Sequence, residues 1–539
     1  MDTKALRQKV LDLAIRGKLV PQNPNDEPAS VLLERIRQQK QQMVKEGKLK
    51  AKDIKNDSII FVGEDNLHYE KFADGSVKCI EDEIPFDLPE GWVWSRLGTV
   101  AAFVGGYAYK SNRYVQHSNN LLIRIGNVKN NSLTPHVAKI CISDEYAAET
   151  SGYRLHVNDI LFTMTGTRGK RDYFFSCLIK KENLNGANLF LNQRVGCLRL
   201  IDTKLMIPDY FVEAIQSSYV LDAIFATETG NVNQGNIGST ATLMLLIPVP
   251  PTSEQYRISE RTKSLISSID QYNIEAAELL CLIQATKSKI LDLAIRGQLV
   301  PQDPADEPAS VLLERIRAEK EELIRQGKFK RNKKESVIFK GEDNSYYEKM
   351  VDGKLHCLDN HLPFKLPDGW AWCNLSMVGT TNIGLTYRPT DIEPSGIMVL
   401  RSCNIVNDQV DLSDLVRVRT TIRENQFAQK NDILICARNG SRSLVGKCAL
   451  IPDLGEPASF GAFMAIYRTE YFEFIVHYFR SSFFRSVFDD SNSTAINQLT
   501  QDMLKRAIVP LPPLSEQRRI VETIDAMLFE LNQIEKGLS

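Results

Sequence analysis

"KVLDLAIRGKLVPQNPNDEPASVLLERIR" (Lys9–Arg37) returns later in the chain as "KILDLAIRGQLVPQDPADEPASVLLERIR" (Lys289–Arg317). The two stretches are identical at 25 of 29 positions. Such similarity, with very different sequence in between, predicts a chain that is made of two copies of one structural unit.

Further pairs of words repeat in the same order in both halves. They are "SIIFVGEDNLHYEKFADG" (58–75) and "SVIFKGEDNSYYEKMVDG" (336–353), "IPFDLPEGWVW" (84–94) and "LPFKLPDGWAW" (362–372), "VNDILF" (157–162) and "KNDILI" (430–435), and "IPVPPTSEQYRI" (247–258) and "VPLPPLSEQRRI" (509–520). Similarity is low over residues 95–246 and 373–508. The pattern favours a shared frame with two separately tuned inserts; the alternative is plain drift after duplication.

Composition places the chain among ordinary globular proteins. It has 539 residues, 43% of them hydrophobic and 25% charged, and a formal net charge of −1. The ten cysteines include no C-x-x-C pair, which argues against a zinc site and favours reduced thiols. The first residues are polar and no window approaches 18 consecutive apolar residues, so we expect a cytoplasmic protein.

The frame is expected to be helical. No proline or glycine occurs over Glu254–Arg296, apolar residues recur there at helical spacing, and Gly297 supplies a stop signal. Ser253 and its counterpart Ser515 are predicted N-caps. About 43 residues at 1.5 Å each would reach roughly 65 Å, a length that suits a strut. Residues 30–48 and 310–328 predict a second, shorter helix in each copy.

The two ends of the chain complement each other. The C-terminal segment, residues 515–539, matches the first half of the long central helix, and the N-terminal segment, residues 2–18, matches its second half. We therefore expect a pseudo-twofold molecule in which the termini meet and the central helix lies antiparallel to a helix assembled from both ends.

The inserts are expected to be α/β. In the first, four apolar runs predict strands (residues 119–128, 159–166, 174–179 and 194–200), and residues 208–226 predict one amphipathic helix that starts with proline. In the second, eleven of the fourteen basic residues are arginine, the side chain best suited to guanine and phosphate.

Polar loops in the inserts are candidate DNA contacts. Basic residues gather in residues 109–114 and 165–172 of the first insert and in residues 385–390 and 438–443 of the second. Pairs of asparagine and glutamine, which can read adenine edges, stand at Asn192/Gln193, Asn233/Gln234 and Asn497/Gln498.

Catalytic motifs are missing. "GSRSLVGKC" (Gly440–Cys448) has five residues between its glycines where a phosphate-binding loop has four, and it ends in cysteine where magnesium needs serine or threonine. The sequence has no G-x-G-x-x-G after a strand, no H-E-x-x-H, and no aminomethyltransferase N/D-P-P-Y/F motif. The sequence therefore favours a binding protein over an enzyme.

Taken together, these motifs resemble the specificity subunit of type I restriction–modification enzymes. The resemblance rests on "LPxGWxW", the R-x-x-N pairs Arg124/Asn127 and Arg401/Asn404, "NDIL" at 158–161 and 431–434, the Asn-Gln pair before the last strand, "PxPPxSEQ" and the two long helical regions. It covers nearly the whole chain.

The resemblance implies an α+β fold, with two α/β target-recognition domains separated by long antiparallel helices in a pseudo-twofold internal repeat. The expected parts are an N-terminal helical region with an acidic extension (1–85), a first recognition domain (86–251), a central long-helix region with an acidic extension (252–362), a second recognition domain (363–513) and a C-terminal helix that pairs with the N-terminal one (514–539).

The resemblance also implies a role. Each recognition domain would read one half of a split, asymmetric double-stranded DNA target, and the paired helices would set the gap and dock two modification (adenine methyltransferase) subunits. Restriction (helicase-nuclease) subunits would add translocation and cleavage. This chain would hold no cofactor; S-adenosylmethionine, ATP and Mg²⁺ are expected on the partner subunits.

Within this interpretation the expected DNA-binding residues lie in the polar loops. In the first domain they are Arg168, Lys170, Arg171, Tyr107, Lys110, Arg113, Asn233 and Gln234. In the second they are Arg438, Asn439, Arg442, Tyr387, Arg388, Asn497 and Gln498. For the tyrosines, ordinary packing is an equal alternative. Trp92, Trp94, Trp370 and Trp372 are predicted core anchors.

Two other functions fit parts of the sequence. A stand-alone DNA-binding regulator would read DNA without enzyme partners. The long apolar helices argue against it, because such a protein needs no docking surface. A protein-binding scaffold would show no salt-sensitive DNA binding, whereas phosphate contacts make affinity fall steeply with salt.

Overall fold

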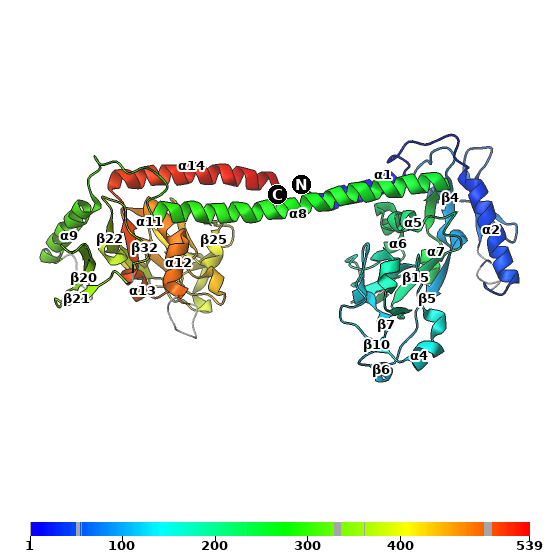
Figure 1. Cartoon of the computed structure of the whole chain (residues 1–539), viewed down its shortest axis with the longest axis horizontal. Coiled ribbons are helices and arrows are strands. Elements are labelled where there is room, and N and C mark those ends of the chain that lie inside the picture. The colour runs from blue at the N-terminus through cyan, green and yellow to red at the C-terminus, as the bar shows by residue number, and fades with distance from the viewer. Residues whose placement is uncertain are drawn as a thin grey trace. The chain divides into compact units, whose positions relative to one another are not determined.

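The computed structural model describes residues 2–49, 54, 57–231, 233–327, 336–360, 362–489 and 498–538. The chain divides into two compact units, Met1–Glu275 and Ala276–Ser539 (Figure 1). Each unit contains one copy of the repeated words, as expected from the sequence. The finer division into five parts stays a prediction.

The first unit is a mixture of helices and short strands. Its helices are α1 (Thr3–Ile15), α2 (Ala29–Lys45), α3 (Leu97–Val100), α4 (Asp144–Glu149), α5 (Pro208–Ile215), α6 (Ser218–Phe225), α7 (Ser239–Leu243) and the first part of α8 (Thr252–Ile295). Its strands are β1 (Ser58–Val62), β2 (His68–Phe72), β3 (Val77–Cys79), β4 (Val93–Arg96), β5 (Ala101–Gly105), β6 (Tyr114–Val115), β7 (Asn120–Ile123), β8 (Val128–Lys129), β9 (Ser132–Leu133), β10 (Cys141–Ile142), β11 (Ile160–Thr163), β12 (Thr165–Gly166), β13 (Ser176–Leu178), β14 (Asn188–Leu191), β15 (Val195–Leu200), β16 (Thr229–Asn231), β17 (Gln234–Asn236) and β18 (Leu246–Val249).

The second unit repeats this order. After the last part of α8, its helices are α9 (Ala309–Arg325), α10 (Leu375–Val378), α11 (Phe472–Arg480), α12 (Ser482–Asp489), α13 (Gln501–Arg506) and α14 (Leu514–Leu538). Its strands are β19 (Ser336–Lys340), β20 (Tyr346–Met350), β21 (Leu355–Cys357), β22 (Ala371–Asn374), β23 (Thr380–Ile383), β24 (Ile392–Leu400), β25 (Ile405–Val406), β26 (Gln409–Val410), β27 (Val416–Val418), β28 (Phe427–Ala428), β29 (Ile433–Cys436), β30 (Cys448–Leu450), β31 (Ala458–Phe460), β32 (Met464–Arg468) and β33 (Ile508–Leu511).

The two inserts share a sheet topology despite their different sequences. One four-stranded antiparallel sheet has the order β13-β11-β15-β5 in the first unit and β30-β29-β32-β23 in the second. A second sheet contains one parallel pair, β14 with β7 and β31 with β24. All four runs predicted as strands in the first insert contain strands, so the α/β expectation is confirmed.

A two-stranded ladder closes each insert. Strand β4, which carries the second tryptophan of the W-x-W word, pairs antiparallel with β18, which carries the first proline of the P-x-P-P word, so that Trp94 lies opposite Pro248. In the second unit Trp372 lies opposite Pro510. The words that repeat on the two sides of each insert are therefore hydrogen-bonded to each other.

The long helix starts earlier than predicted. Helix α8 has 44 residues and begins at Thr252, so Ser253 lies in its first turn and is not its N-cap. The reason is that the amides of Glu254 and Gln255 already donate to the Pro251 carbonyl, both at 2.9 Å. Helix α14 likewise begins at Leu514, before the serine predicted to cap it.

The predicted single helix over residues 208–226 is two helices. Helix α5 ends at Ile215 and α6 starts at Ser218. The Ser217 side chain caps the second helix, and Asp12 of α1 accepts hydrogen bonds from the amide and hydroxyl of Ser218 at 2.8 and 2.6 Å. Side chains that compete for the backbone favour a helix start over a helix interior.

In each unit α8 runs antiparallel to a second helix, α1 in the first and α14 in the second, and Figure 1 shows the α8–α14 pair. In the first, Arg7 of α1 forms an ion pair with Asp270 of α8, while Gln22, just after α1, bonds to Glu254 at the start of α8. In the second, Lys287 of α8 binds Glu535 near the end of α14 at 2.5 Å. The predicted meeting of the two chain ends concerns the two units together and stays a prediction.

A buried hydrogen-bonded cluster connects three of the repeated sequence segments, those that contain Trp92, Gln22 and Glu254. The indole of Trp92 donates to Glu254 Oε2 at 3.0 Å, and Gln22 donates to the other oxygen at 3.2 Å. In the second unit Trp370 and Gln302 donate to Glu516 at the same distances. We call each set the tryptophan–glutamate cluster.

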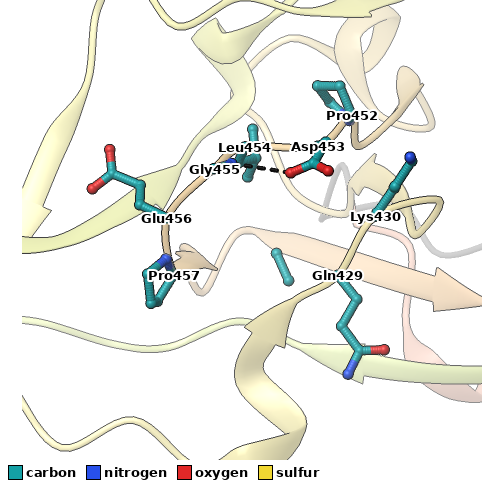
Figure 2. Close-up of a pocket in the computed structure, with 9 residues that line it drawn as sticks. Gln429, Lys430, Pro452, Asp453, Leu454, Gly455, Glu456 and Pro457 are labelled. Carbon is teal, nitrogen blue, oxygen red and sulfur yellow. Dashed lines mark hydrogen bonds between the residues drawn. The ribbon is translucent and has the colours of Figure 1, made fainter.

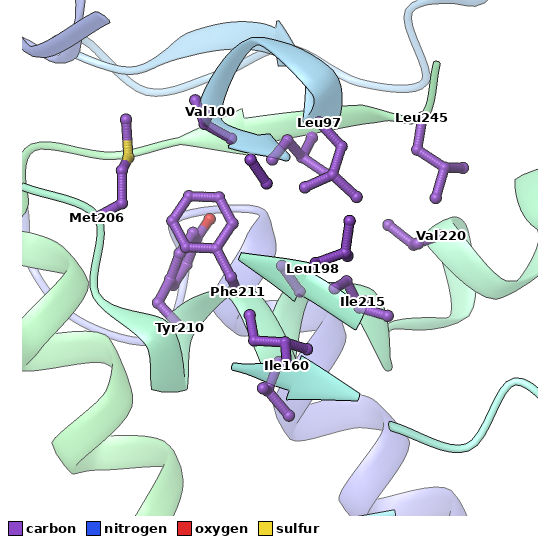
Figure 3. Close-up of a cluster of buried hydrophobic side chains, with 14 of the residues drawn as sticks. Leu97, Val100, Ile160, Leu198, Met206, Tyr210, Phe211, Ile215, Val220 and Leu245 are labelled. Atoms are coloured by element: carbon purple, nitrogen blue, oxygen red, sulfur yellow. The ribbon is translucent and has the colours of Figure 1, made fainter. Parts of the chain in front are cut away.

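All four tryptophans are buried, which confirms their prediction as core anchors. The core of the first unit gathers side chains from the sheets, α3 and α5 (Figure 3). Tyr210 and Phe211 of α5 are fully buried there.

Among the described residues, no helix has the length and apolar character that crossing a membrane requires.

A buried ionisable side chain faces the long helix that follows the insert at the same place in each unit, α8 in the first and α14 in the second. Counted from the serine that starts the following helix, Glu213 of α5 corresponds to His477 of α11. Burial raises the pKa of Glu213 to about 8, and Ser259 on α8 donates to its carboxyl at 3.4 Å. Burial also lowers the pKa of His477, to about 3. Both groups are therefore neutral at pH 7.

The tryptophan–glutamate cluster predicts an asymmetry between neighbouring tryptophans. Trp92→Phe removes a donor from buried Glu254, whereas Trp94 Nε1 has no hydrogen-bond partner among the described residues. A lost partner for a buried polar group costs about 1–3 kcal/mol. Urea unfolding of the full chain should therefore show Trp92→Phe to be less stable than the control, Trp94→Phe, by about that amount. Equal losses would contradict a stabilising role of the hydrogen bond.

Glu213 predicts a pH dependence. Its pKa is about 8 in the folded chain, against an ordinary value of 4.5. The folded state therefore binds more protons between these values, and stability falls as pH rises from about 4.5 to about 8. Glu213→Gln should stabilise the chain by a growing amount over this range, reaching a few kcal/mol. Thermal unfolding at pH 5 to 9 measures the difference; a gain that is the same at every pH would contradict the assignment.

Candidate nucleic-acid interface

The predicted loop of the first insert lies against a hairpin that carries an Asn-Gln pair. Strand β12 pairs with β17, with Thr165 opposite Asn236, and β17 pairs with β16. Arg168, in the loop after β12, donates to the Gly230 carbonyl at 2.9 Å. Asn233 and Gln234 are exposed at the turn of this hairpin. The structure thus brings together residues that stand more than 60 positions apart.

The other two cations of this loop differ in their surroundings. Lys170 is exposed. Arg171 has a φ of 50° and binds Asp222 of α6 at 2.6 Å, with its guanidinium 5.5 Å from the Phe225 ring. Arg171 therefore joins the loop to α6, and a DNA phosphate would have to compete with Asp222 for its charge.

The second predicted group of the first insert is a tyrosine cluster. Tyr107 lies 4.9 Å from Tyr109 and 5.2 Å from Tyr153, measured between ring centroids, and it is half-buried. Arg113 lies 3.6 Å above the Tyr146 ring and makes two hydrogen bonds to Glu149, at 2.7 and 2.9 Å. These contacts support the packing alternative for Tyr107 and assign Arg113 a structural contact.

Lys110, in contrast, points to solvent. Its side chain is exposed, while its backbone amide donates to the Tyr146 hydroxyl at 3.2 Å and its carbonyl accepts from the Arg113 amide at 3.1 Å. It is the member of this group that is best placed to meet a ligand.

A tight turn links the two loops of the first insert. The amide of Gln193 donates to the Tyr107 carbonyl at 3.0 Å, and the amide of Met164 donates to the Arg194 carbonyl at 3.1 Å. A Cβ at Gly106 would stand 2.1 Å from the Asn192 carbonyl oxygen, so the approach requires glycine. The turn thus holds the loop of Tyr107 and the loop of Arg168 beside one another.

The second insert has the same arrangement. Arg438 is exposed after β29, pairs with Gln498 in an isolated bridge, and donates its amide to the Phe463 carbonyl at 3.0 Å. Asn439 accepts from the Ser441 amide at 3.0 Å and so shapes the turn before Arg442, which is exposed. The predicted partner of Gln498, Asn497, lies outside the described residues.

Tyr387 and Arg388 follow a loop that meets the equivalent turn. Gly384 donates to the Met464 carbonyl at 3.1 Å and Leu385 to the Phe460 carbonyl at 2.8 Å. Tyr387 packs against a small apolar cluster that includes Leu385, while the Arg388 side chain is exposed. As in the first unit, the tyrosine packs and the neighbouring cation faces solvent.

Two exposed side chains of this surface were missed in the sequence. Arg194 and Phe463 occupy the last position of the turn before β15 and β32, and Phe463 is 61% exposed. The Arg438 guanidinium lies 5.5 Å from the Phe463 ring. Both residues adjoin apolar runs that read as strand, and no local signal separates the turn from the strand.

The asparagine of the R-x-x-N motif holds a loop in place. Asn127 is buried, accepts from the Arg124 amide at 2.9 Å, and donates to the Thr134 and Val137 carbonyls at 3.0 Å each. Asn404 makes the same set of bonds in the second unit. A buried amide with this many backbone partners holds a loop rather than a ligand.

The NDIL motif is also structural. Asn158 and Asn431 have positive φ values of 71° and 69°, which asparagine tolerates well. The following Asp159 is 2% exposed and binds Arg199 at 2.7 Å, and its counterpart Asp432 binds Arg468 at 2.6 Å. The motif therefore combines a turn with a buried aspartate that pairs with a half-buried arginine.

A shallow hollow of about 360 Å³ opens on the second insert, between the β30–β31 connection and the start of the NDIL turn. Figure 2 shows Lys430 and Asp453 on its wall. None of the residues predicted to contact DNA lines it. All ten cysteines are free thiols, and over the described ranges no three His, Cys, Asp or Glu side chains are grouped to hold a metal ion.

Comparison with known proteins matches two segments of the chain, which contain most of the two inserts, to one family model. Residues 89–279 and 384–539 match the model of the type I restriction modification DNA specificity domain. The chain belongs to this family. The resemblance inferred from the repeated words is thereby confirmed, together with the expectation of a non-catalytic specificity subunit.

Named relatives agree along the whole chain. The EcoAI specificity subunit of Escherichia coli is 26% identical, over 98% of this chain and 90% of that protein. The EcoEI specificity subunit of Escherichia coli is 24% identical, over 99% and 90%. Shorter similarity, 33% identity over 31% of the chain and 38% of the relative, links it to the EcoKI subunit of Escherichia coli strain K12.

A solved structure supports the fold. This structure was solved to explain complex assembly and conformational transition of the type I R-M system. It superposes on the chain with a TM-score of 0.53 at 17% identity, over 84% of this chain and 94% of that one. At this identity the likeness supports the α+β fold of two recognition domains with long helices.

Proposed function

We propose that each unit of this specificity subunit reads one half of a split, asymmetric double-stranded DNA target. The observation that carries the proposal is the recurrence of one arrangement on two different sequences. In both units an arginine-bearing loop, after β12 or β29, lies beside a second chain segment with an exposed glutamine, Gln234 or Gln498. Arginine and glutamine side chains are suited to guanine and adenine edges.

The side chains most suited to contact DNA are those that remain exposed. They are Arg168, Lys170, Asn233 and Gln234 in the first unit, and Arg438, Arg442, Arg388 and Gln498 in the second. Lys110 and the turn residues Arg194 and Phe463 join them. Arg113 and Arg171 already bind carboxylates, so their contribution to DNA binding is smaller.

The partners follow from the same proposal. The antiparallel helices of the frame dock two modification (methyltransferase) subunits, and restriction (helicase-nuclease) subunits join the complex. The partners supply the S-adenosylmethionine, ATP and Mg²⁺ that methylation and cleavage require, and this chain holds no cofactor. A net charge of −1 is compatible with DNA binding because partners that enclose the duplex add phosphate contacts.

Arg168→Ala and Arg438→Ala should each weaken DNA binding by the assembled complex. Loss of one arginine contact costs about 1–3 kcal/mol, roughly five- to 150-fold in affinity. Fluorescence anisotropy measures the change, with a duplex that carries the sequence which the complex methylates. Arg35→Ala is the matched control, because Arg35 is an exposed arginine on α2 that pairs with Glu27 at 2.7 Å. Unchanged affinity in both test variants, with native melting, would remove these residues from the interface.

An exchange of inserts tests the two-headed arrangement. N6-methyladenine is mapped across DNA from cells that express the chain with its modification subunit. The map is repeated after residues 95–246 are replaced by the insert of a relative. We expect a split motif of which only one half changes. Absence of methylation, or a motif that the exchange leaves intact, would show that the inserts do not read DNA.

A further inference from the structure

Each unit carries a small three-stranded antiparallel sheet just before its W-x-W strand. The first is β1-β2-β3 and the second is β19-β20-β21. All of residues 58–79 and 336–357 lie outside the segments that match the family model, 89–279 and 384–539. We call these sheets the first and the second meander.

The inner face of each meander packs on the frame through a polar network. In the first, buried Glu70 accepts from Ser58 at 2.5 Å and from Arg96 of β4 at 2.7 Å. In the second, Glu348 accepts from Asn374 of β22 at 3.2 Å. These contacts orient the opposite face of each sheet toward solvent.

The outer face is apolar and exposed. Phe61 stacks on Tyr69 with ring centroids 5.9 Å apart, and Phe339 stacks on Tyr347 at 6.0 Å. Exposed apolar neighbours extend the surface. The exposed fractions are 39% for Ile59, 41% for Phe61, 52% for Val77, 40% for Phe339 and 56% for Leu355. A contiguous exposed apolar patch marks an interaction site more often than a scattered one does.

The two copies are similar on the outer face as well as on the inner one. The outer positions pair as Ile59/Val337, Phe61/Phe339, Tyr69/Tyr347, Lys71/Lys349, Val77/Leu355 and Cys79/Cys357. On the inner face Ser58/Ser336, Ile60/Ile338 and Glu70/Glu348 are identical. Packing within the fold accounts for the similarity of the inner face, and a partner common to both units would preserve that of the outer face.

We propose that the outer faces of the two meanders are paired docking sites for two copies of one protein, the modification subunit. The inference rests on the proposed function for the identity of that partner. Two near-identical faces in a chain whose inserts differ require a partner that is present twice, and the modification subunit is expected in two copies. The aromatic pair forms the centre of each site, as is usual for protein interfaces.

The charge around each face defines the partner's chemistry. Acidic residues outnumber basic ones by seven to two over residues 58–83 and by five to three over residues 336–362. Asp65 and Asp343 lie at the edge of the aromatic pair, each accepting from a tyrosine hydroxyl at 2.7 Å. The partner surface is therefore an apolar centre with a basic rim, and the same acidity disfavours DNA as the occupant.

Substitution of the central aromatic tests the proposal. Phe61→Lys and Phe339→Lys, alone and together, replace the apolar centre with a charge that repels a basic partner. The purified full-length chain is titrated with the purified modification subunit by calorimetry, and stoichiometry is read by native mass spectrometry. We expect each single variant to weaken one of two sites at least tenfold and the double variant to weaken both. DNA binding by the chain alone should not change.

Two further sets of variants make the result specific. Val77→Lys and Leu355→Lys alter the same faces without breaking the aromatic pair, and should have the same direction of effect. Val137→Lys is the matched control, because Val137 is 61% exposed in the first insert and far from the meanders in sequence. Thermal melting confirms that each variant is folded.

The outcomes separate the inference from the proposed function. A folded double variant that binds two modification subunits with wild-type affinity overturns the docking sites and leaves the proposed function standing. A self-association of the chain that the double variant loses would make a second copy of the chain the occupant and also overturns the inference. A wild-type chain that binds no modification subunit overturns both.

Discussion

The hydrogen bond between an indole and a buried carboxylate is the interaction on which each unit depends. Trp92 lies just before the insert and Glu254 lies in the first turn of the helix that follows it, 162 positions later. Their bond, completed by Gln22, forces the two ends of the insert together. Because Glu254 is 1% exposed, its carboxyl needs these donors, and any insert that fits between the two ends inherits the same frame.

This constraint explains why the repeated words are similar and the inserts are not. The segments with the tryptophan, glutamine and glutamate supply the cluster. The asparagine of R-x-x-N holds a loop, and the buried aspartate of NDIL pairs with a half-buried arginine. Each word satisfies buried polar groups, which leaves little freedom for change. The loops that carry Arg168 and Arg438 bury no such groups, so their residues are free to differ between the units, as the proposed reading of two different half-targets requires.

The sequence also predicted some elements wrongly, and for physical reasons. Ser253 was expected to cap α8, but the Pro251 carbonyl already accepts the first helical hydrogen bonds. The helix over residues 208–226 breaks because Ser217 caps a new helix and Asp12 binds its first turn. A local pattern shows neither effect, since one depends on backbone geometry and the other on a side chain about 200 positions away.

By itself, the sequence determined the duplicated frame, the α/β inserts, the buried tryptophans and the family, because these follow from repeated words and periodic apolar residues. Only the tertiary structure decided which polar residues face solvent. It placed Arg168 beside the hairpin of Gln234, engaged Arg113 with Glu149, and exposed Phe463 at a turn. Pairing across distant segments determines whether a charge is available, and a single sequence does not record that pairing.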